Sequence, residues 1–121
     1  MPTRHTSGWK EISGTDPVEL WRVTVNRKAR LVKIMIYNRD TTDHYVEFGE
    51  IDPTTSPVTW VSTKLPRIPV LAGQMVVLSE EDIPSEYVVS KDTSTIRSWA
   101  AKLDAAVSAN NVEVSVEVEE E

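Results

Sequence analysis

The sequence contains no cysteine and only two histidines, and both scarcities limit its chemistry. Without cysteine the chain has no disulfide framework, no thiolate zinc site and no cysteine nucleophile. His5 and His44 lie far apart and form no His-x-His pair, which argues against a transition-metal site. They also leave few groups for general acid–base catalysis at neutral pH.

Glycine is scarce and scattered, at positions 8, 14, 49 and 73. This spacing excludes a phosphate-binding glycine loop, and no Gly-x-Ser-x-Gly elbow occurs. The acidic groups at Asp40/Asp43 and Glu80–Asp82 match no calcium-loop spacing and indicate solvated turns. We therefore expect no enzyme activity and no catalytic, cofactor-binding or metal-binding residue.

Long apolar runs are also missing. None approaches the roughly 18 residues that suggest a membrane span. The first nine residues lack the apolar segment of a signal peptide. These features predict a soluble protein made in the cytoplasm, with no membrane partner.

Negative charge is concentrated in the second half of the chain. The net charge is −6; residues 1–60 carry eight basic and eight acidic side chains, whereas residues 61–121 carry five and eleven. An acidic half is a poor partner for nucleic acid, whose binding depends on neutralising phosphates, so we expect no sequence-specific nucleic-acid binding. A local basic cluster at 22–33 is either a solvated hairpin or a docking patch for an acidic surface.

Valine at every second position makes residues 112–118 the clearest structural signal. The intervening residues are acidic or Ser115, which is typical of a strand with one buried face. Residues 20–25, 29–37 and 44–49 also alternate. In 29–37 we expect one face to hold Val32, Ile34 and Ile36 and the other to hold Leu31, Lys33, Met35 and Tyr37. In 44–49 we expect His44, Val46 and Phe48 to share the inner face. The pattern predicts an all-β fold, an antiparallel β-sandwich or jelly-roll-like barrel.

Residues 95–109 fit two periods. Ile96, Trp99, Leu103 and Val107 fit a helix, while alternation also fits. We favour a strand followed by a turn, and one short helix near 95–107 stays open as the alternative.

The first 18 residues are polar and show no sustained periodicity. They are expected to form an extended N-terminal arm (1–18) outside the core of a β-sandwich domain (19–121). Trp9 and Ile12 are the large apolar residues of this arm after Met1, so they are candidates for contacts with a neighbouring subunit.

Opposite charges provide a second set of candidate assembly contacts. Glu117 and Glu119 of the acidic terminal strand could meet Arg27, Lys28 and Arg30 of another copy, which would close a symmetric homo-oligomer such as a trimer. The alternative is that charge protects an exposed sheet edge. Exposed tryptophan, at Trp60 or Trp99, would instead suit a carbohydrate- or protein-binding module.

Three segments resemble small β-sandwich virion proteins of tailed bacteriophages. They are Ala29–Asp40 followed by His44-Tyr45-Val46, the turn and strand Leu71–Leu78, and the alternating valine strand that ends in glutamate, Val112–Glu121. The resemblance covers about residues 20–118, and the motifs describe hairpins rather than a binding site.

The resemblance implies a non-enzymatic structural protein of the virion, assembled in the host cytoplasm. It suggests a capsid decoration (cement) protein that binds the lattice as a homo-oligomer. Its partners would be further copies of itself and the major capsid protein or another virion protein. A neck or tail accessory protein is the alternative within the same class.

Overall fold

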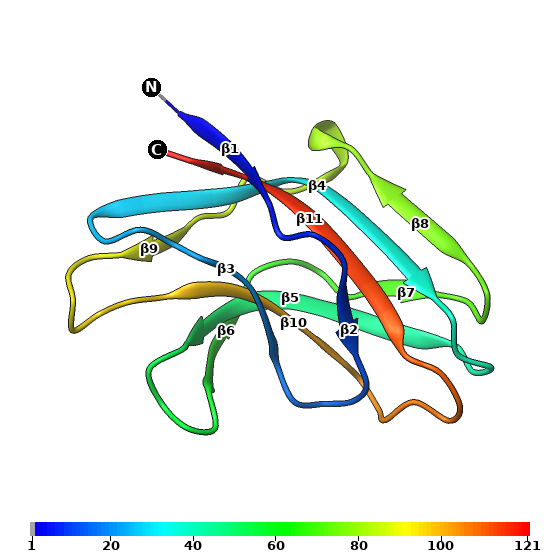
Figure 1. The fold of residues 1–121 in the computed structure, drawn as a ribbon. Helices are drawn as coiled ribbons and strands as arrows, with labels where there is room; N and C mark the ends of the chain where they lie inside the picture. Colours follow the sequence, from blue (N-terminus) through cyan, green and yellow to red (C-terminus); the bar gives the residue numbers. More distant parts are fainter. Residues whose placement is uncertain (1) are drawn as a thin grey trace.

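Two antiparallel β-sheets packed face to face form the molecule (Figure 1). The structure is a computed structural model of the 121-residue chain and describes residues 2–121. The elements are β1 (Thr3–Thr6), β2 (Lys10–Ile12), β3 (Val18–Arg22), β4 (Arg27–Asn38), β5 (His44–Asp52), β6 (Thr59–Thr63), β7 (Ile68–Val70), β8 (Met75–Leu78), the 3-10 helix η1 (Glu80–Asp82), β9 (Val88–Ser90), β10 (Ser98–Leu103) and β11 (Val112–Glu120).

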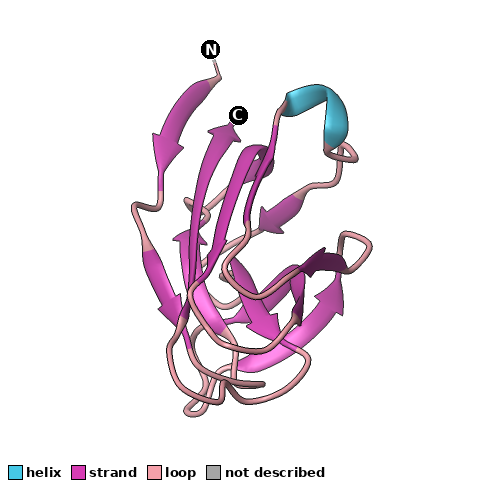
Figure 2. Cartoon of the chain, turned by 90° about the vertical axis from the view of Figure 1, so that its right-hand side faces the viewer, coloured by secondary structure: helices cyan, strands magenta, loops and turns pink. Residues whose placement is uncertain are grey.

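Sheet A has the strand order β1-β11-β4-β8, with β2 also paired to β11 and β9 to β4. Sheet B has the order β3-β10-β5-β6, with β7 also paired to β5. Figure 2 turns the right-hand side of Figure 1, where β8 and β7 lie, toward the viewer. The predicted all-β sandwich is confirmed, and over residues 2–121 the two sheets form no closed barrel. No helix in that range has the length and apolarity needed to cross a membrane.

The valine strand lies at the centre of sheet A. Val112, Val114, Val116 and Val118 are all buried in the core, and β11 pairs with β4 along nearly its whole length. The alternation of this strand therefore did predict which side chains form the inner face.

Strand β4 departs from simple alternation at Val32. Lys33 pairs with Glu117 but Leu31 pairs with Val118, so the strand carries one extra residue at this point. Such a bulge shifts the alternation. As a result Leu31 joins Ile34 in the core cluster, although the sequence placed them on opposite faces.

The N-terminal segment belongs to the sandwich. Strand β1 pairs with the end of β11, and β2 pairs with its beginning, where Ile12 lies opposite Val112. Ile12 is fully buried in the core, so the expectation that it lies outside is wrong. The segment is polar because β1 and β2 form an edge of sheet A, where few side chains can reach the core.

Residues 98–103 form strand β10 between β3 and β5, and the helical alternative is wrong. Trp99, Ala101 and Leu103 belong to the core cluster, whereas Ala100 does not, as alternation requires. Trp99 also donates a hydrogen bond from Nε1 to the carbonyl oxygen of Ala29, at 2.9 Å, and so joins sheet B to sheet A. The high local propensity of alanine for helix is overridden by pairing on both sides.

Candidate interaction surface

The outer side of sheet A carries an exposed apolar surface. Met35 pairs with Val77 and Tyr37 with Met75 across β4 and β8, so these four side chains are neighbours. The residues between and beside them in the two strands pack into or against the core: Ile34, Ile36, Val76 and Leu78. The four paired side chains therefore point to the outside. Met75 is 52% exposed and Val77 54% exposed. We call Met35, Tyr37, Met75 and Val77 the outer apolar face.

Two ion pairs border the outer apolar face on its β11 side. Arg39 lies 3.3 Å from Glu113, and Lys33 lies 3.9 Å from Glu117. Because both basic side chains already have an acidic neighbour in the same chain, they add little net charge to the surface. The result is an apolar centre with a neutral, polar border, which is the composition of many protein interfaces.

Four charged residues form a closed network at the end of sheet A near both termini. Arg4 lies 3.1 Å from Glu80 and 3.2 Å from Glu119, and Arg30 lies 2.6 Å from Glu80 and 3.1 Å from Glu119. Hydrogen bonds from Arg30 and then Arg4 hold the pKa of Glu80 below its usual value. The network therefore joins β1, β4, β11 and η1 through alternating charges.

The predicted contacts Arg30 and Glu119 thus bind each other within one chain. The sequence suggested that they meet between copies, because they are 89 residues apart in the chain. Strand pairing brings them together instead, since Glu119 lies directly opposite Arg30 in the β4–β11 ladder. Glu117 is placed in the same way, opposite Lys33.

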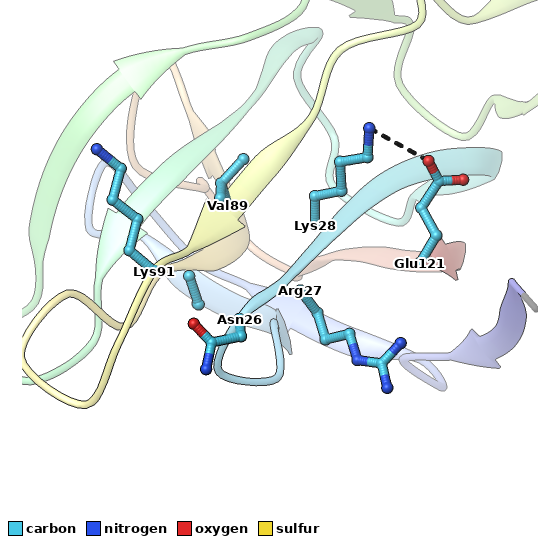
Figure 3. Close-up of a pocket in the computed structure, with 7 residues that line it drawn as sticks. Asn26, Arg27, Lys28, Val89, Lys91 and Glu121 are labelled. Atoms are coloured by element: carbon cyan, nitrogen blue, oxygen red, sulfur yellow. Dashed lines mark ion pairs between the residues drawn. The ribbon is translucent and has the colours of Figure 1, made fainter.

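Arg27 and Lys28 line a shallow basic cavity of about 470 Å³ at the start of β4, between β9 and Glu121 (Figure 3). Lys28 lies 3.2 Å from Glu121 and 4.5 Å from the ring centre of Tyr87. Lys91 extends from the far side of the same cavity (Figure 3). Lys28 is thereby engaged within the chain, while Arg27 is exposed.

Trp9 is 48% exposed in the loop between β1 and β2. Gly8 before it has φ +67°, a conformation that glycine adopts without strain, and Ser7 bonds to Val116 on β11. The loop is thus fixed to sheet A while the indole stays partly in solvent. Among the predicted apolar contacts, Trp9 is available to a partner and Ile12 is not.

Asp40 and His44 form a buried polar group with a structural role. His44 Nε2 and Thr42 Oγ1 each donate to Asp40 Oδ2 at 2.8 Å, and the backbone N–H groups of residues 108–110 donate to the same carboxylate. Burial alone would raise the pKa of Asp40, but these hydrogen bonds, led by the one from His44, hold it well below its usual value. The group fastens the β10–β11 loop to the β4–β5 loop.

Neither acidic turn is arranged as a metal site. The Asp40 carboxylate already accepts the hydrogen bonds described above, and Asp82 accepts hydrogen bonds from Ser79 at the start of η1. Among residues 2–121, no three histidine, aspartate or glutamate side chains are grouped as metal ligands.

Trp60 lies against the backbone of β5 on sheet B. A Cβ at Gly49 would be 2.5 Å from Trp60 Cζ2, so only glycine allows the indole to lie there. Lys102 Nζ is 4.1 Å from the centre of the same ring. Because an ammonium group covers the ring, Trp60 offers no open platform for a sugar, and the other candidate, Trp99, is fully buried.

Sequence reasoning missed the outer apolar face. Met35 and Tyr37 were assigned to the second face of their strand, and Met75–Leu78 was expected to be a strand, but no pattern showed that the two strands are adjacent. The sequence of β8 is apolar at all four positions, so it carries no alternation that would mark Met75 and Val77 as outward-facing.

No protein-family model and no curated protein matches this chain. Among solved structures, a chain in the capsid of Helicobacter pylori bacteriophage KHP30 is similar, with TM-score 0.54, 12% identity, and coverage of 98% of this chain and 92% of that chain. The CBM22-1 xylan-binding domain of Paenibacillus barcinonensis Xyn10C has TM-score 0.46 and 11% identity over 98% and 83%. The coat protein of Tobacco streak virus has TM-score 0.46 and 14% identity over 98% and 84%.

At these identities the similarities concern the fold. Of these three, only the phage capsid chain has a TM-score above 0.5. The chain therefore has a β-sandwich fold of a kind that also occurs in a bacteriophage capsid.

Proposed function

We propose that this chain is a non-enzymatic structural protein of a bacteriophage virion, which decorates the capsid lattice as a homo-oligomer. The observation that carries the proposal is the outer apolar face of sheet A. The resemblance of the hairpin segments to virion proteins and the fold shared with a phage capsid chain support the same class. The particle would be assembled in the host cytoplasm.

The outer apolar face suits a lattice contact because its apolar side chains are rigidly placed. Tyr37 and Met35 are on β4, which is held between β11 on one side and β8 and β9 on the other. Solvent-exposed apolar side chains that form one group on a sheet usually mark a binding surface. Trp9, in the loop between strands β1 and β2 of the same sheet, adds an aromatic side chain of the type enriched in interfaces.

The partner is expected to be a protein surface that is itself largely apolar. The charged residues bordering the face are paired within the chain, so they attract neither sign strongly. Binding to the lattice should accordingly depend weakly on salt concentration, in contrast to binding governed by unpaired charge.

The proposal is tested by sedimentation. In lysates of cells in which the chain is produced from its native genome, it should sediment with particles of virion size. Tyr37→Ser should weaken its binding to those particles about tenfold, as is common for a buried aromatic contact. Tyr45→Ser is the matched control, since Tyr45 is similarly exposed but lies on sheet B.

Two results would contradict the proposal. A chain that stays with protein-sized material in the gradient is no virion component. Equal effects of Tyr37→Ser and Tyr45→Ser would show that the outer apolar face is not the contact.

A neck or tail accessory protein is the second candidate, favoured by the same apolar face. Gold-labelled antibody to the chain would mark the whole capsid surface if the chain is a decoration protein. If it is an accessory protein, the antibody would mark only the tail or the neck that joins the tail to the capsid.

A further inference from the structure

The free edge of strand β8 has the chemistry of a site for strand addition. Its sequence, Met75-Val76-Val77-Leu78, contains no charge, proline or glycine. One edge pairs with β4, and no other strand pairs with it among the described residues. Proteins usually protect such edges, because unpaired N–H and C=O groups accept another strand.

The other edge strands of the two sheets are protected. They carry charge, proline or hydroxyl side chains, at Arg4 in β1, Lys10 and Glu11 in β2, Glu19 and Arg22 in β3, Thr59, Ser62 and Thr63 in β6, Pro69 in β7, and Ser90 in β9. Strand β8 is the apolar exception, and this difference points to a partner.

The backbone of β8 presents Met75 and Val77 to the open edge. Asn38 donates to the carbonyl oxygen of Gln74, so this pair is hydrogen-bonded. In an antiparallel ladder such pairs alternate, and Val76 and Leu78 therefore direct their backbone groups toward β4. The N–H and C=O groups of Met75 and Val77 are left for a neighbour.

We propose that β8 pairs antiparallel with β8 of a second copy across a two-fold axis at Val76. In this register Met75 lies opposite Val77 of the other copy, and their four free N–H and four free C=O groups allow four hydrogen bonds in total. The outer apolar faces of the two copies then form one continuous surface. This deepens the proposed homo-oligomer and rests on that part of the proposed function.

A second copy fits this edge for three reasons. The strand is complementary to a second copy of itself, because every residue of β8 is apolar. Each chain has a net charge of −6, but the pairing of two β8 strands brings none of these charges together within the paired strands. The partner's residues 79 and 80, at the start of η1, would face Gly73 and Ala72, and a Cβ at Gly73 would meet nothing within 4 Å, so there is space.

The third reason is an apolar cavity of about 250 Å³ at the end of β8, beside Leu78. It is lined mainly by Leu65, Ile68, Pro69, Leu78, Ile83 and Pro84. A strand added to β8 would pass this cavity at Leu78 as well as extend the sheet, so pairing reduces the exposed apolar surface at this end of the edge.

The first test measures molar mass by light scattering over a concentration series. The wild-type chain should reach at least twice its 13.6 kDa. Val77→Pro removes an N–H that bonds to nothing in β4, and Val77→Lys places a charge at the edge; each should weaken association at least tenfold. Val61→Lys, on edge strand β6 and similarly exposed, is the control and should associate like wild type.

The second test uses the absence of cysteine. Val76→Cys places single cysteines opposite each other at the two-fold axis, where Cα atoms of a non-hydrogen-bonded pair are about 4.5 Å apart and can form a disulfide. Mild oxidation should give a covalent dimer with this variant and not with Val61→Cys.

A monomeric wild-type chain, or oligomers unaffected by both Val77 variants, would overturn the inference. Equal cross-linking of the two cysteine variants would do so too. These results are separate from the virion role: a monomer that still sediments with particles refutes the strand pairing alone, and a β8-linked dimer that never does refutes the lattice role alone.

Discussion

Replacing Trp99 by phenylalanine should destabilise the sandwich by about 2 kcal/mol. The side chain is fully buried, and its Nε1 donates to the carbonyl oxygen of Ala29 on the opposite sheet. Loss of that hydrogen bond costs about 1 kcal/mol. The smaller ring leaves a gap of about 40 Å³, which at roughly 24 cal/mol per Å³ costs about 1 kcal/mol more.

The corresponding fall in melting temperature is about 8 °C. At roughly 2.1 cal/mol/K per residue, the unfolding entropy of a chain this size is about 0.25 kcal/mol/K. Thermal unfolding followed by circular dichroism measures the shift. Trp60→Phe is the matched control: Trp60 is partly exposed, and its Nε1 bonds to the accessible hydroxyl of Thr63, so that change should cost well under half as much.

A Trp99→Phe variant no less stable than Trp60→Phe would refute the reasoning. It would mean that neither the bond between the sheets nor the packing of the indole contributes as the structure indicates.

Three further outcomes are expected. The folded protein lowers the pKa of Asp40, so its carboxylate stabilises the fold above about pH 4 and loses this effect as the pH falls further. Asp40→Asn should therefore lower the urea midpoint of unfolding more at pH 7 than at pH 2.5, and equal losses at the two pH values contradict this. Gly49→Ala should cost about 1–3 kcal/mol or more in urea unfolding, whereas Gly14→Ala, whose new Cβ would find its nearest atom at 3.8 Å, should cost less than 1 kcal/mol. Arg30→Ala removes the largely shielded pair with Glu119 as well as the pair with Glu80, so it should lower the melting temperature more than Arg22→Ala, which breaks one exposed pair; the reverse order would count against the network.

The sequence predicted the sandwich well where one face of a strand is buried and the other is wet. In β11 and β5 the alternation identified the buried valines and the buried His44, Val46 and Phe48. These strands are regular over the residues concerned, so a period of two maps directly onto the two faces.

Prediction from the sequence failed where the position of a residue depends on pairing with a strand that is far away along the chain. The bulge at Val32 moved Leu31 into the core, and nothing local marks it. Ile12 is buried because β2 lies beside β11, about 100 residues further along the chain. Local polarity suggested a free arm instead.

The candidate surface shows the same limit. Single residues of the outer apolar face could be assigned to strands, but their grouping needs the pairing of β4 with β8. The predicted charge contact between copies was an error of the same kind, since Arg30 and Glu119 meet in the ladder of one chain.

The pairing of β1 with the end of β11 has a mechanical consequence. Thr3 lies opposite Glu120, so the two ends of the chain leave the molecule side by side (Figure 1). A force that pulls these ends apart acts across the ladder and opens its hydrogen bonds one after another, like a zipper, rather than shearing them together. The first piece to peel away would be β1, whose detachment must break the ion pairs of Arg4 with Glu80 and Glu119, while the remaining sandwich keeps its core.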